Sequence, residues 1–159
     1  MMISHKGTKT QRNRLRAKSF VAMCLRASNT ETIDMNEELE QIAKDVVDAS
    51  MKLHIALGPG LLESVYNVIL QKKLQERGYQ VEREVPIPVE YEGLQFELGF
   101  RADLIINGCF IVELKSVEKL APVHAKQLLT YLKVTDTRLG LLINFGEALL
   151  KDGIKRIAN

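Results

Sequence analysis

The chain has 159 residues, enough for one domain with a substantial core. Its apolar fraction of 46% and charged fraction of 26% are those of an ordinary soluble globular protein, and no apolar stretch approaches membrane-spanning length. The two cysteines, Cys24 and Cys109, fit neither a metal-binding spacing nor a disulfide framework, so we expect a reducing, cytoplasmic setting. With three scattered His residues, a zinc site is not expected.

The net charge of +2 is distributed unevenly along the chain. Residues 1–30 contain seven Lys or Arg residues and no acidic residue, so the rest of the chain carries a net charge of −5. We therefore expect residues 1–33 to form a basic, flexible extension and residues 34–159 to form the folded domain. Three interpretations of the extension stay open: an arm that contacts nucleic-acid phosphates, an organelle transit peptide, or a segment upstream of a functional start at Met35.

Two helices are predicted at the start of the domain. The first spans residues 34–57, with Asp34 and Glu37 forming a capping box, and a Gly-Pro-Gly sequence at 58–60 breaks it. The second spans about residues 61–77. We expect the second helix to pack through four apolar residues and to present another face with a carboxylate in its first turn. The expected core residues are Leu62, Val65, Ile69 and Leu74, and the other face carries Glu63, Tyr66, Asn67 and Leu70.

Strands dominate the second half of the chain. Residues 79–91 alternate in polarity, and Pro86 and Pro88 favour an edge position for that strand. A further strand leads from Leu94 into a central hairpin. After this hairpin we expect a helix, a strongly apolar strand and a short terminal hairpin. Their predicted ranges are 122–133, 138–145 and 147–157, the last with its turn at Asp152-Gly153, and the helix shows a polar stripe of His124, Gln127 and Tyr131.

This order of elements predicts an α/β fold, with a mixed central β-sheet flanked by helices on both faces. The central hairpin spans residues 100–115, with its turn at Asn107-Gly108. A two-residue turn would place Asp103 and Glu113 on opposite faces of the sheet. A three-residue turn, with Gly108 in the left-handed conformation, places both acids and Lys115 on one face and separates apolar from polar residues more cleanly. We therefore predict the three-residue turn.

Asp103, Glu113 and Lys115 are unusual in strands that are otherwise strongly apolar. A pair of charges on an edge strand is most often a solvated surface. Central strands favour a different interpretation, because a buried charge needs a partner or a metal ion. Two carboxylates suit Mg²⁺ or Mn²⁺ beside a phosphate, and a neighbouring lysine can offset the charge that builds up there.

The same residues resemble a known family. Asp103 followed by Glu113-Leu114-Lys115 is similar to the core motif of the PD-(D/E)xK nuclease superfamily, which has the restriction-endonuclease-like fold. The stretch from Gly60 to Tyr66 resembles the motif of the GxxExxY family within that superfamily, and the resemblance extends over residues 34–159. Ala102 stands where the superfamily motif has proline.

The resemblance implies a role for five residues. Asp103 and Glu113 would hold the metal, and Glu63 would add a further acidic ligand from a preceding helix. Lys115 would position the attacking water. Gln127 would line the site. The expected function is a Mg²⁺- or Mn²⁺-dependent nuclease acting on DNA or RNA. The alternatives are a non-catalytic interaction module that keeps the fold and a metal-dependent hydrolase of a small nucleotide, and a homodimer or a protein partner stays open.

Overall fold

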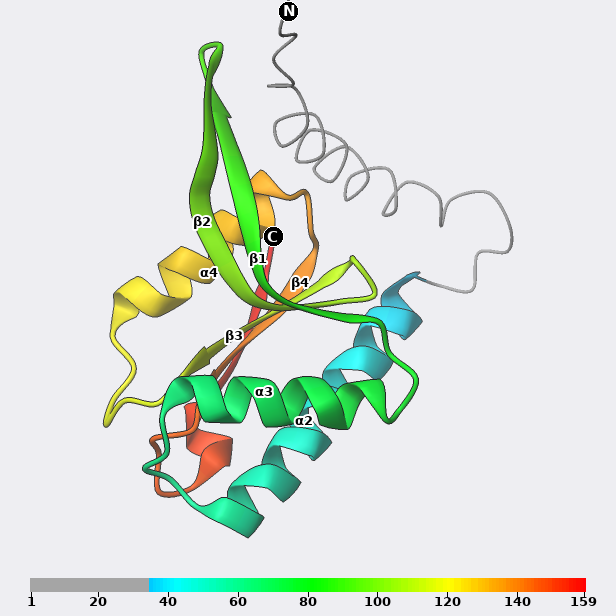
Figure 1. Ribbon diagram of the computed structural model, residues 1–159, viewed down its shortest axis with the longest axis vertical. Helices are drawn as coiled ribbons and strands as arrows, with labels where there is room; N and C mark the ends of the chain where they lie inside the picture. Colours follow the sequence, from blue (N-terminus) through cyan, green and yellow to red (C-terminus); the bar gives the residue numbers. More distant parts are fainter. Residues whose placement is uncertain (1–34) are drawn as a thin grey trace, which may run out of the picture.

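The computed structural model describes residues 35–159, shown in Figure 1. The predicted basic extension, residues 1–33, and the predicted helix cap Asp34 lie outside the described residues. The elements follow in the order α2 (Met35–Leu57), α3 (Glu63–Gln75), β1 (Val81–Tyr91), β2 (Leu94–Ile106), β3 (Phe110–Lys115), α4 (Pro122–Val134), β4 (Leu139–Asn144), a short 3₁₀ helix η1 (Leu150–Gly153) and β5 (Ile154–Ala158).

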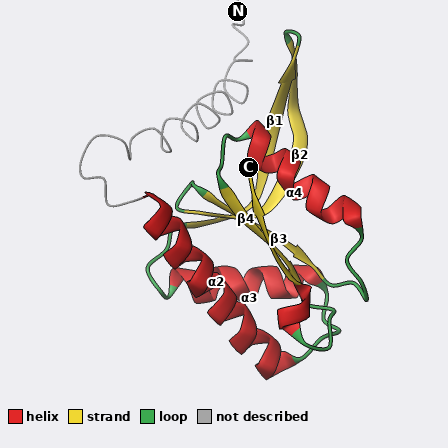
Figure 2. Cartoon of the chain, turned by 180° about the vertical axis from the view of Figure 1, so that it is seen from behind, coloured by secondary structure: helices red, strands yellow, loops and turns green. Residues whose placement is uncertain are grey.

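The five strands form one mixed sheet in the order β1-β2-β3-β4-β5. Neighbouring strands are antiparallel except β3 and β4, which are parallel and are connected through α4. Helices α2 and α3 cover one face of the sheet and α4 covers the other, as the two opposite views show (Figure 1, Figure 2). This arrangement confirms the predicted α/β fold. Within residues 35–159, no helix is both long and apolar enough to cross a membrane.

The turn of the central hairpin has the predicted three-residue form. Ile106 pairs with Phe110, and the backbone of Asn107 and Gly108 is left-handed, with φ values of 49° and 67°. The predicted alternation places Ala102 on the face of Leu104 and Cys109 on the face of Ile111, and both assignments are wrong. Cys109 packs against the α2/α3 core because it belongs to the turn, where strand alternation does not apply, and Ala102 packs on the α4 side because β2 has already separated from β3 there.

Helix α3 packs mainly through its second face and not through the predicted core face, of which only Leu74 is buried. Tyr66, Asn67, Leu70 and Leu74 are buried, whereas Leu62 is 73% exposed and Val65 is 36% exposed. The reason is long-range: the Tyr66 ring stacks on Phe145, with centroids 4.2 Å apart and an interplanar angle of 10°. The buried face is also the face of Glu63, so the docking of α3 turns that carboxylate toward the sheet.

The end of the chain differs from the predicted terminal hairpin. Asp152 and Gly153 end the 3₁₀ helix η1, and the following strand β5 pairs antiparallel with β4. The sheet thus gains its last strand from residues that the sequence placed in a local hairpin. At the other edge, β1 is an edge strand as its prolines indicated, and the β1–β2 hairpin projects beyond the rest of the sheet (Figure 2). The tip of this hairpin exposes Tyr91, Leu94 and Phe96.

Candidate active site

The site lies where β2 and β3 separate. Their regular pairing ends with Leu104 opposite Val112. One residue beyond, the Oδ2 atom of Asp103 accepts a hydrogen bond of 2.8 Å from the backbone N–H of Leu114. The carboxylate therefore takes the place of a strand-to-strand hydrogen bond, and this contact fixes Asp103 beside the end of β3 that carries Glu113 and Lys115.

Glu113 is the buried acid of the group, with only 3% of its side chain exposed. Its Oε1 atom accepts hydrogen bonds from Lys115 Nζ at 2.8 Å and from Gln127 Nε2 at 3.3 Å. Its Oε2 atom is also buried and has no hydrogen-bond partner. A buried carboxylate oxygen without a partner is costly, and a proton shared with Asp103 or a bound cation would offset that cost.

Glu63 enters the site from the first turn of α3. Its Oε1 atom lies 3.8 Å from Lys115 Nζ. Tyr66, one turn later, donates a hydrogen bond of 2.6 Å to the carbonyl of Gly58 and accepts one of 3.2 Å from the N–H of Leu61. Gly60 lies between Gly58 and Leu61 and has a φ of 107°, a backbone conformation that favours glycine. The spacing of Gly60, Glu63 and Tyr66 thus lets the Tyr66 hydroxyl hold the preceding loop against α3, the helix that carries Glu63.

Asn144 holds the loop that follows Lys115. Its Oδ1 atom accepts hydrogen bonds from the N–H groups of Val117 and Gly146, and its Nδ2 atom donates to the carbonyl of Val117 at 2.7 Å. A side chain at Gly146 would place its Cβ 2.2 Å from the carbonyl oxygen of Val117. We did not single out Asn144 from the sequence. The signal was present, because an amide at the end of a strongly apolar strand must find partners when it is buried.

Tyr131 completes the α4 side of the site, and its predicted place in a solvent-facing polar stripe was wrong. Its ring is buried and lies 5.1 Å from the ring of Phe100, and its hydroxyl is hydrogen-bonded to Gln127. Gln127 therefore bridges Tyr131 and Glu113. This bridge fixes the orientation of the Gln127 amide, which in turn holds Glu113 Oε1.

Burial raises the pKa values of the three acids, and the charge of Asp103 raises those of Glu113 and Glu63 further. Burial is the main cause for each, and for Glu113 the charge of Asp103 adds to it and brings its pKa to about 7. The pKa values of Asp103 and Glu63 are also raised, although Lys115 opposes both shifts. Burial alone would lower the pKa of Lys115, but the charges of Glu113, Asp103 and Glu63 outweigh it and raise that pKa. Lys115 is therefore a cation in a site that accumulates negative charge.

The donor set fits a divalent cation that brings further ligands of its own. Among residues 35–159, no three His, Cys, Asp or Glu side chains are grouped so that they could hold a metal ion by themselves. Asp103 and Glu113 offer hard carboxylate oxygens, one of them the unpartnered Oε2. Mg²⁺ is commonly held by one or two carboxylates together with waters and substrate phosphates. Glu63 contacts Lys115, so its predicted metal ligation stays a prediction.

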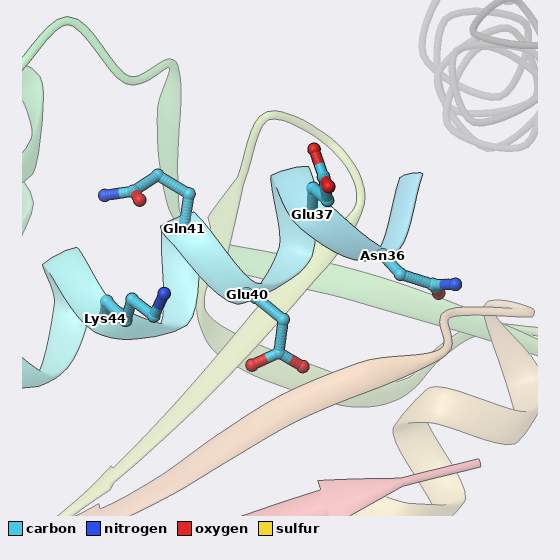
Figure 3. A pocket seen from close by; sticks show the side chains of 5 residues that line it. All are labelled: Asn36, Glu37, Glu40, Gln41 and Lys44. Carbon is cyan, nitrogen blue, oxygen red and sulfur yellow. The ribbon is translucent and has the colours of Figure 1, made fainter. Parts of the chain in front are cut away.

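A shallow surface depression on α2 lies apart from these residues. Among the described residues it is lined by Asn36, Glu37, Glu40, Gln41 and Lys44, whose side chains project from one stretch of helix (Figure 3). None of the five predicted site residues lines it. The candidate site is therefore defined by its side-chain chemistry and not by this depression.

The family comparison agrees with this geometry. The model of the PD-(D/E)XK nuclease superfamily matches residues 40–157, which is well over half of the chain and includes all five predicted site residues. No curated protein and no solved structure matches the chain. The mixed sheet with helices on both faces is consistent with the restriction-endonuclease-like fold of that superfamily. The chain belongs to the PD-(D/E)XK nuclease superfamily.

Proposed function

We propose that the protein is a phosphodiesterase that cleaves DNA or RNA with the help of Mg²⁺ or Mn²⁺. The observation that carries this proposal is the buried, unpartnered Oε2 atom of Glu113 beside Asp103 and Lys115. Superfamily membership supports nuclease chemistry and nucleic-acid binding. The Tyr66 hydroxyl is hydrogen-bonded to the loop that contains Gly60. This link within the Gly60-Glu63-Tyr66 motif further supports placing the chain in the GxxExxY group of that superfamily.

Each residue of the site has a separate role in the proposed cleavage reaction. Asp103 is held by the N–H of Leu114 and Glu113 by Gln127 and Lys115, so the two carboxylates are fixed before any ligand arrives. A divalent cation bound by them would lower the pKa of a water and polarise the phosphate. Lys115 stays protonated beside them and stabilises negative charge on the phosphate oxygens. Glu63, 3.8 Å away, helps to keep the ammonium at this position.

The test is a cleavage assay on a panel of labelled single- and double-stranded DNA and RNA, with Mg²⁺, Mn²⁺ or EDTA. We expect metal-dependent cleavage, and a loss of about 100-fold or more in rate for Lys115→Ala, the usual scale for removing one electrostatic stabiliser. Lys119→Ala is the matched control, since Lys119 is exposed and follows Lys115 closely in the chain. Thermal melts check that both variants are folded.

Two outcomes would overturn the proposal. Cleavage that Lys115→Ala retains in full would belong to a contaminating nuclease. A folded wild-type protein that cleaves no member of the panel would instead be the non-catalytic interaction module that keeps this fold.

A further inference from the structure

The last residues of β3 are supported by the backbone of one neighbouring strand only. Regular pairing with β2 ends with Leu104 opposite Val112. Pairing with β4 continues to Lys115 opposite Asn144. On the open side, the Asp103 carboxylate takes over one hydrogen bond of the missing ladder. The position of Lys115 therefore depends on β4 and on side chains that replace strand-to-strand hydrogen bonds.

Asn144 is the second side chain of this kind. Its amide accepts from the N–H of Val117 at 2.9 Å and donates to the carbonyl of the same residue at 2.7 Å, as a neighbouring strand would. The adjacent N–H of Phe145 donates to the carbonyl of Lys115 at 2.7 Å. Asn144 is fully buried, so its amide would be costly without these partners. Lys115 is thus followed directly by backbone that the end of β4 holds.

Ser116 holds the same segment from the α3 side. Its hydroxyl donates a hydrogen bond of 2.7 Å to the carbonyl of Leu61, in the loop that precedes α3. The N–H of Leu61 in turn donates to the hydroxyl of Tyr66, so this loop is itself held against α3. Residues 115–117 are therefore connected to β4 on one side and to the helix that carries Glu63 on the other.

The ammonium of Lys115 follows the position of this backbone. Its Nζ atom donates to the carbonyl of Leu114 at 2.7 Å and to Glu113 Oε1 at 2.8 Å, and both acceptors belong to the same strand end. A shift of the strand end would thus move the ammonium and the Glu113 carboxylate relative to Asp103, which lies on β2. Because a reaction depends on the relative positions of such groups, a small displacement is expected to lower its rate.

We propose that Asn144 and Ser116 are positioning residues of the site: by holding residues 115–117 from two sides, they keep Lys115 and Glu113 at a fixed position relative to Asp103. This inference rests on the proposed nuclease function. Both side chains act through the backbone next to Lys115 and not on the substrate. Their loss should therefore slow the chemical step and leave substrate binding nearly unchanged.

The experiment compares Asn144→Ala and Ser116→Ala with two matched controls. Thr137→Ala removes a buried, hydrogen-bonded polar side chain just before β4, at the end of the strand away from Lys115. Thr130→Ala removes, like Ser116→Ala, a hydroxyl that donates to a backbone carbonyl near the surface. Cleavage kinetics with Mn²⁺ on the best DNA or RNA substrate give kcat and KM. Urea unfolding identifies conditions under which each variant is folded.

Asn144→Ala should lower kcat by at least about tenfold, because a small displacement of reacting groups has an effect of this size, and should change KM less than about twofold. Ser116→Ala should lower kcat about fivefold, the usual scale of one hydrogen bond. Both controls should keep kcat within about twofold of wild type. Equal losses in a variant and its control, or a change in KM alone, would overturn the positioning role. If Asn144→Ala does not fold, Ser116→Ala and Thr130→Ala decide the comparison.

A second measurement needs neither metal nor substrate. In EDTA, NMR hydrogen exchange compares the N–H of Leu114, which donates to the unchanged Asp103, with the N–H of Val112 in the middle of β3. Asn144→Ala should accelerate exchange at Leu114 by at least about tenfold more than at Val112, because the strand end loosens locally. Thr137→Ala should change both rates by the same factor. An unchanged ratio in Asn144→Ala would overturn the role of Asn144.

The two proposals fail differently. If wild type cleaves no member of the panel, the nuclease function fails, and the exchange ratio still decides whether Asn144 holds the strand end. If wild type cleaves and folded Asn144→Ala keeps the wild-type kcat, the nuclease function stands and the positioning role fails.

Discussion

The two faces of the sheet differ in what they bury. Among the residues that the structure describes, 20 buried apolar residues form one cluster on the α2/α3 face, whereas the cluster on the α4 face has eight. The smaller cluster borders Glu113, Gln127 and the hydroxyl of Tyr131, polar groups that are costly to bury. The difference indicates a division between stability and chemistry: the α2/α3 face holds the sheet, so that the α4 side can hold a partly buried charged site.

The largest effect is expected from a substitution in the α2/α3 face. Phe145 is fully buried and stacks on Tyr66, so Phe145→Ala should lower the free energy of unfolding by about 3–5 kcal/mol. Leu149→Ala, at a residue 57% exposed, should change it by less than about 0.5 kcal/mol. Urea unfolding monitored by circular dichroism measures both. A loss below about 1 kcal/mol for Phe145→Ala would show that this face is not the main source of stability.

The next prediction concerns the free-energy cost of burying Glu113 on the α4 side of the sheet. The pKa of Glu113 is raised from 4.5 to about 7, so the folded protein binds this proton more tightly than the unfolded chain does. Without metal, stability should therefore fall as the pH rises from 4.5 to about 7, by up to about 3 kcal/mol, and then level off. Urea unfolding in EDTA across this range tests it.

Glu113→Gln should remove most of that pH dependence, because the amide does not titrate. Glu118→Gln is the matched control, since Glu118 is exposed and carries the same charge change. A wild-type stability that stays constant or increases between pH 4.5 and 7 would contradict the expected cost of burying Glu113.

The smallest effect concerns Asp103. Asp103→Asn keeps an oxygen that can accept the Leu114 N–H and removes one of two repelling charges, so without metal it should be as stable as wild type or slightly more stable. Millimolar Mn²⁺ should raise the melting temperature of wild type by about 3 °C and leave Asp103→Asn almost unchanged. Thermal melts with and without Mn²⁺ measure this. If Mn²⁺ does not shift the melting temperature of wild type, the catalytic interpretation is wrong and the protein is the non-catalytic interaction module.

Local patterns in the sequence were sufficient for the central hairpin. The alternation of polar and apolar residues decided the turn length, and the structure places Asp103, Glu113 and Lys115 together as that parity required. Local patterns misassigned α3, because its buried face depends on Tyr66 stacking on a phenylalanine from a strand much later in the chain. The same holds for β5, whose partner β4 lies beyond η1. Periodicity carries no information about which ring or strand an element packs against.

The contact between Gly146 and Val117 has a consequence for recognising superfamily members that keep this site intact. Any side chain at position 146 would push against the backbone that follows Lys115, where the Asn144 amide bridges both segments. A substitution of Gly146 would therefore disturb the loop after Lys115 even in a relative that keeps the Asp, Glu and Lys of the motif. A survey of relatives that scores only Asp103, Glu113 and Lys115 would miss this change. The triplet Asn144-Phe145-Gly146 should therefore be scored together with them.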